Sequence, residues 1–143
     1  MIEKIAYENE LYAIIIRADY DSEGIQFFTP DDFSQQMAFM GHKKGHEIIP
    51  HFHNRVERTV HYTQEVLVIR QGVLRVNFYN SDKVRVQTTL LNKDDIILLC
   101  NGGHGFEVVE DVKMVEIKQG PYLQENDKVR FEPAGDIVDE YKH

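Results

Sequence analysis

Short runs of β-forming residues, each bounded by turn residues, are the feature that most constrains the fold of this chain. No apolar pattern with the period of a helix continues for long, and no internal repeat is visible. Closely spaced runs of this kind are typical of β-sandwiches and β-barrels. The pattern predicts strands over residues 11–18, 25–28, 36–41, 47–53, 64–70, 73–79, 84–91, 95–99, 105–109 and 113–118, with hairpin turns at Gly72 and at 80–82.

The length of the chain predicts one domain. Its 143 residues fall in the commonest size range of domains and are enough to bury a core. We expect a single all-β domain with a barrel core over about residues 36–118. N-terminal strands within residues 1–35 would extend one sheet, and the polar tail, residues 119–143, would lie over the surface or on a partner.

Charge and composition exclude several classes of partner. Twenty-four acidic and sixteen basic residues give a formal charge of -8, which repels phosphate backbones and anionic lipid surfaces. No apolar run approaches the roughly 18 to 20 residues of a membrane-spanning helix. Cys100 is the single cysteine, and the N-terminus lacks the apolar stretch of a signal peptide. We therefore expect a soluble, cytoplasmic protein that binds neither nucleic acid nor membranes.

One apolar segment predicts self-association. Residues 11–16 are strongly apolar and would form an adhesive edge if their strand lay at the border of a sheet. Symmetric pairing of two copies is the commonest way to cover such an edge. We therefore expect a homodimer.

Two histidines, His51 and His53, stand one residue apart in the predicted strand 47–53. Side chains at this spacing point to the same face of a strand. Inward-facing residues of a barrel converge from separated strands, so Glu65 and His104 can join them. Three imidazoles and one carboxylate suit a divalent transition metal such as iron, manganese, nickel or zinc. The residues predict a metal site formed by His51, His53, Glu65 and His104.

The spacing of these residues resembles the first sequence motif of the cupin superfamily. From Gly45 the order is five residues, the His-Phe-His triplet 51–53, eleven residues, Glu65, six residues and Gly72. The family motif has a glycine, a His-x-His triplet, a glutamate and a glycine in this order, with a shorter segment before the glutamate. Glu57 stands at that shorter spacing, but only Glu65 also places the final glycine correctly.

Residues 94–104 follow the second cupin motif more loosely. Asp94 replaces the usual glycine, Cys100 replaces the usual proline, and His104 comes one residue early. The resemblance spans about residues 45–118 and implies a double-stranded β-helix, the jelly roll of small single-domain cupins. It also implies that the four predicted ligands bind a metal. The beginning of the tail, residues 119–128, is similar to the end of the sugar-nucleotide ketoisomerase branch of the family.

The segment between the histidine pair and Glu65 supplies candidates for substrate contacts, because it should hang over the mouth of the barrel. Arg55 and Arg58 can hold a substrate carboxylate or phosphate through paired hydrogen bonds, and Tyr62 lies in the same segment. His61 is the candidate general acid or base, because an imidazole titrates near neutral pH. The alternative is an ordinary solvated loop of charged residues.

Three functions from different classes agree with this pattern. The first is a metal-dependent enzyme for a small polar metabolite related to sugars or sugar acids, in which the metal polarises a substrate oxygen. Isomerase, lyase and dioxygenase are not distinguished. The second is a module that binds a small ligand without turnover. The third is a metal-free sugar-nucleotide isomerase or epimerase whose histidines act as acid and base, in which case the barrel holds no metal.

Overall fold

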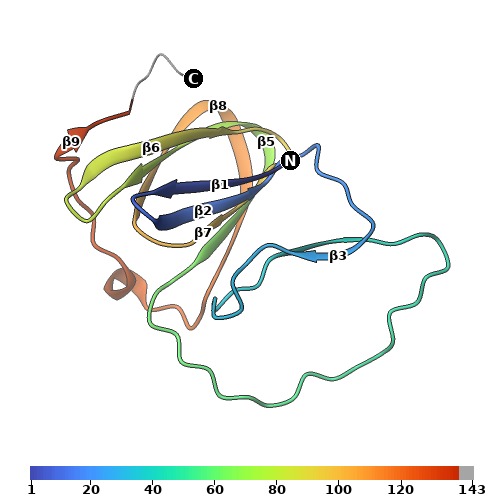
Figure 1. Cartoon of the computed structure of the whole chain (residues 1–143). Coiled ribbons are helices and arrows are strands. Elements are labelled where there is room, and N and C mark those ends of the chain that lie inside the picture. Colours follow the sequence, from blue (N-terminus) through green and yellow to red (C-terminus); the bar gives the residue numbers. More distant parts are fainter. Residues whose placement is uncertain (139–143) are drawn as a thin grey trace.

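The computed structural model describes residues 1–138, and its regular elements are strands apart from one short 3-10 turn, η1 (Gln124–Asp127) (Figure 1). The predicted all-β class is therefore confirmed. No helix in the described part of the chain is long and apolar enough to cross a bilayer. The strands are β1 (Ile2–Tyr7), β2 (Glu10–Ile16), β3 (Gly24–Phe27), β4 (Ala38–Gly41), β5 (Glu65–Tyr79), β6 (Val84–Leu91), β7 (Ile96–Leu99), β8 (Gly103–Lys118) and β9 (Gly135–Asp136).

The main sheet curls strongly into a half-barrel (Figure 1). Its seven strands follow the order β1-β2-β7-β5-β6-β9, with β8 paired to β5 outside this path. The first part of β5 lies between β7 and β8, and its last part lies between β6 and β8. Strands β3 and β4 form a separate two-stranded sheet. The finer jelly-roll arrangement stays a prediction.

Strand β2 is covered on both faces. Ala13 and Ile15 belong to the larger core cluster, whereas Ile14 and Ile16 belong to a second cluster that contains Met37. In the sheet, β2 has β1 on one side and β7 on the other. The apolar stretch is thus an interior strand, and it does not form the bare edge on which the sequence-based expectation of a dimer rested.

The hairpin predicted at Gly72 is wrong, whereas a turn at the predicted residues 80–82 does join β5 to β6. β5 continues through Gly72, and β8 likewise joins the predicted strands 105–109 and 113–118. Gly72 has a φ of 83°, and a Cβ atom there would lie 2.0 Å from the carbonyl oxygen of Asp111. The glycine therefore permits a close crossing of β5 over β8, where the pairing register shifts.

Residues 42–64, which we call the arm, join β4 to β5 without regular structure. The predicted strand 47–53 lies in the arm, and that prediction is wrong for this structure. A strand requires a hydrogen-bonded neighbour, and among residues 1–138 no strand pairs with this segment. Figure 1 shows the arm as a wide loop that leaves the body of the protein on the side of β3.

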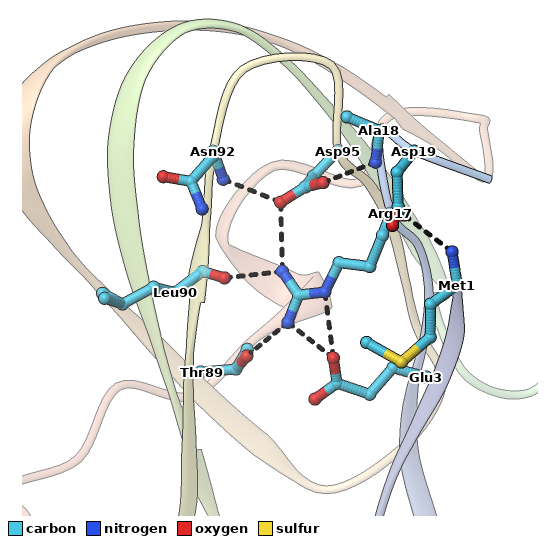
Figure 2. A network of polar contacts seen from close by, with 9 residues as sticks. All are labelled: Met1, Glu3, Arg17, Ala18, Asp19, Thr89, Leu90, Asn92 and Asp95. Atoms are coloured by element: carbon cyan, nitrogen blue, oxygen red, sulfur yellow. Dashed lines mark hydrogen bonds and ion pairs between the residues drawn. The ribbon is translucent and has the colours of Figure 1, made fainter. Parts of the chain in front are cut away.

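A polar network closes one end of the sheet (Figure 2). Arg17, directly after β2, donates hydrogen bonds to Glu3 at 2.7 Å and to Asp95 at 3.0 Å. It also donates to the Thr89 hydroxyl at 3.0 Å and to the Leu90 carbonyl at 2.7 Å. These bonds tie β1, β2, the end of β6 and the start of β7 together.

Candidate functional site

Glu65 and His104 meet beside the concave side of the curl. The Nε2 atom of His104 lies 3.3 Å from Oε2 of Glu65. Glu65 is the first residue of β5, whereas His104 pairs with Phe78 near the other end of that strand. The two side chains can meet only because β5 and β8 curl so far that opposite ends of their ladder approach each other.

A cavity of about 660 Å³ opens beside this pair. Residues 127–133 of the tail line it, together with Tyr79 and the turn 100–103. Phe131 of the tail packs edge-on against Tyr79, with 5.4 Å between the ring centroids. The volume lies within the range of small-molecule sites in proteins.

Glycines bring the walls of this cavity close together. Gly102 has a φ of 73°, and a Cβ atom there would lie 2.2 Å from the ring of Tyr12. A Cβ atom on Gly103 would lie 3.0 Å from the ring of Phe131. The two glycines therefore let the backbone of the turn before His104 pass between two aromatic rings.

The charge on Glu65 is stabilised in place. Its hydrogen bond with His104 lowers the pKa of the Glu65 carboxyl, and Lys118 and Lys128 add to this effect, while burial opposes it. The site therefore presents a carboxylate next to an imidazole. Cys100 lines the same cavity, but burial raises the pKa of its thiol to about 12, so it stays protonated at neutral pH.

His51 and His53 lie elsewhere in this structure. Their rings are near each other, with centroids 5.2 Å apart, and both are exposed on the arm. The Nδ1 atom of His51 hydrogen-bonds the carbonyl oxygen of Ile49 at 2.8 Å. Within residues 1–138 no three His, Cys, Asp or Glu side chains are grouped as a metal site. The four predicted ligands thus fit a transition metal in kind, and they form two separate pairs.

Of the other predicted residues of the arm, two line a cavity and the rest are exposed away from both cavities. Tyr62 lines the cavity beside Glu65, and His61 lines a smaller neighbouring cavity of about 250 Å³ together with Tyr62 and Lys118. Arg55 and Arg58 are exposed and line neither of these two cavities. Glu57, the alternative to Glu65, is also exposed on the arm.

Several residues of the site were not predicted from the sequence. Lys128, Arg130 and Phe131 come from the tail, and Tyr79 comes from the end of β5. For the three tail residues the signal was a short basic and aromatic stretch, 128–131, in an acidic chain. The tail has no strand pattern, so the sequence does not indicate which part of the protein it covers.

No family model, no curated protein and no solved structure matches this chain.

Proposed function

We propose that this chain is a metal-binding jelly roll of the cupin type that acts on a small polar metabolite of the sugar or sugar-acid class. The supporting observation is the meeting of Glu65 and His104 beside a cavity of suitable size. The extreme curl that unites them is the geometry expected of a sheet that nearly closes on itself.

Glu65 and His104 are the metal donors that the body of the protein would supply, and His51 and His53 are those of the arm. A divalent metal bound there would polarise a carbonyl or hydroxyl oxygen of the substrate. Around this position, Tyr62, Asn101 and Lys128 line the cavity with a phenol, an amide and an ammonium group. Such groups donate hydrogen bonds to sugar hydroxyls and carboxylates and would orient the substrate.

A metal-free acid–base pair is the second candidate, and the direct contact between Glu65 and His104 favours it. A carboxylate that holds an imidazole fixes the orientation of the ring and stabilises its protonated form. His104 would then transfer a proton to or from the substrate, as an isomerase or epimerase requires.

The metal content of the purified protein separates these candidates. We expect near-stoichiometric iron, manganese, nickel or zinc that is lost in Glu65→Gln and retained in Glu57→Gln. The second variant is a matched control, because it makes the same change at an exposed position outside the cavity. Protein that holds none of these metals and takes up none when they are added would overturn the metal-binding proposal in favour of the acid–base pair.

A further inference from the structure

Strand β8 has an uncovered edge. It pairs with β5 along one side, and no strand in the described part of the chain pairs with its other side. Apolar side chains along β8 are also exposed, from 40% for Phe106 to 61% for Val108. An open edge beside apolar side chains is a template for an additional strand.

The arm is uncovered to a similar degree. Phe52 is 99% exposed and Ile49 is 81% exposed, although both are large and apolar. Near its ends the arm contacts other parts of the chain, since Lys43 pairs with Glu23 and Thr63 hydrogen-bonds Asp127. Between these contacts it extends away from the body (Figure 1). An exposed apolar segment of this kind is expected to be covered by a partner.

The charges of the arm and of β8 are complementary. Residues 42–64 carry four basic and two acidic side chains, a net charge of +2 in a chain of net charge -8. Strand β8 carries two basic and four acidic side chains, a net charge of -2. Opposite net charges favour docking of the arm on β8 and would help to select this edge over others.

The side-chain order of the two segments is also compatible. Along an extended segment 47–53, Ile49, His51 and His53 share one face. Along β8, His104 and Phe106 share a face, and that face holds the contact with Glu65. Antiparallel pairing of the arm with the free edge would place both histidines of the arm beside His104, with Phe52 on the opposite face.

We propose that two copies of this chain exchange arms, so that residues 47–53 of one copy pair with the free edge of β8 in the other. The partner's arm then supplies the two histidines that complete the Glu65–His104 site. This inference rests on the proposed metal site, and it commits to a second copy because each arm extends away from its own body. Exchange of an element between identical copies requires no new surface.

Cross-linking tests the exchange without reference to a metal. In the double variant Phe52→Cys/Glu107→Cys, one thiol lies on the arm and the other on the same outer face of β8. The native Cys100 is buried and does not compete. With a short bis-maleimide and dilute protein, we expect a covalent dimer as the main product, and little dimer from either single variant. A product of monomer mass linked within one chain, or no link, would overturn the exchange.

Mixing of complementary variants tests whether the site is shared. One copy carries His51→Ala/His53→Ala, the other Glu65→Gln/His104→Ala, and the mixed dimer is purified through two different tags. We expect about half of the metal of the wild-type dimer, because one site is intact, and none in either variant alone. A metal-free mixed dimer made from variants of a metal-binding wild type would overturn the exchange and leave the proposed function in place. A wild type without metal would overturn the function, and cross-linking would still decide the exchange.

Discussion

The two ends of strand β7 carry two carboxylate contacts of opposite character, one to a guanidinium and one to an imidazole. At its start, Asp95 is 3% exposed and accepts hydrogen bonds from the backbone N–H groups of Ala18 and Asn92, each at 2.8 Å, in addition to Arg17 (Figure 2). At its other end, Leu99 pairs with Glu65, whose contact with His104 opens on a cavity.

The difference shows which contact is available for chemistry. The oxygens of Asp95 are occupied by three donors inside the protein, so this carboxylate serves the fold. Glu65 and His104 keep 18% and 30% of their side-chain surfaces exposed, so a ligand can reach them. A satisfied buried network stabilises a structure, whereas a half-satisfied pair beside a cavity is where a ligand is expected.

The largest effect on stability is expected at Asp95, where the carboxylate is buried and fully hydrogen-bonded. Asp95→Ala leaves the two backbone N–H groups and part of the Arg17 guanidinium without an acceptor, and we expect the free energy of unfolding to fall by about 3–5 kcal/mol. Urea denaturation measures this change. Asp19→Ala is the matched control, because Asp19 is exposed and pairs with the N-terminal ammonium. If both variants were equally stable, the buried contacts of Asp95 would not stabilise the fold as we expect.

A substitution in the Glu65–His104 contact should change metal binding more than stability. His104→Ala is expected to change the free energy of unfolding by less than about 1 kcal/mol, because its contact with Glu65 is partly exposed. Metal affinity should fall at least about tenfold, as expected for loss of a donor. Titration with metal measures this loss, and His42→Ala on the arm serves as the control. A large loss of stability without loss of metal would assign His104 a structural role.

The pH dependence of stability should contain a smaller contribution from Glu65. Because its pKa in the folded state lies below the ordinary 4.5, its contribution is present above that value and is lost as the pH falls through the folded-state pKa. Glu65→Gln should therefore lose less stability than the wild type on acidification, by under about 1 kcal/mol. Urea denaturation at neutral and acidic pH measures the difference, and identical pH profiles would contradict it.

The smallest effect is expected at Cys100, which follows the last residue of β7 and lies in the wall of the cavity. Since burial raises the pKa of its thiol to about 12, iodoacetamide should not label it in the native protein near neutral pH and should label it after unfolding. Rapid labelling of the native protein, measured by mass spectrometry, would show that this wall of the cavity opens.

Local runs of apolar residues predicted strands both where the partner is close in sequence, as for β6 beside β5, and where it is distant, as for β2 beside β7. The strand 84–91 was predicted with the bounds that β6 has, and β2 and β7 were each predicted within two residues at their ends. β1 was missed because charged residues interrupt the apolar pattern of Ile2–Tyr7. The segment 47–53 was predicted as a strand from composition, but strand formation depends on a partner that no local pattern reveals.

Only the residues of the candidate site that belong to the two sequence motifs could be predicted. The spacing of the first motif selected Glu65, the looser second motif indicated His104 although it comes one residue early, and the structure brings the two side chains into contact. The contribution of the tail, from Lys128 to Phe131, depends on a chain path that sequence alone does not define. The separation of His51 and His53 from the other two ligands depends in the same way on where the arm docks.

Anomalous X-ray scattering from crystals of the metal-loaded protein tests whether two copies share the proposed metal site. We expect one strong peak at the metal absorption edge, bonded to Glu65 and His104 of one copy and to His51 and His53 of another. A peak bonded to other residues, or no peak beside Glu65 and His104, would contradict it.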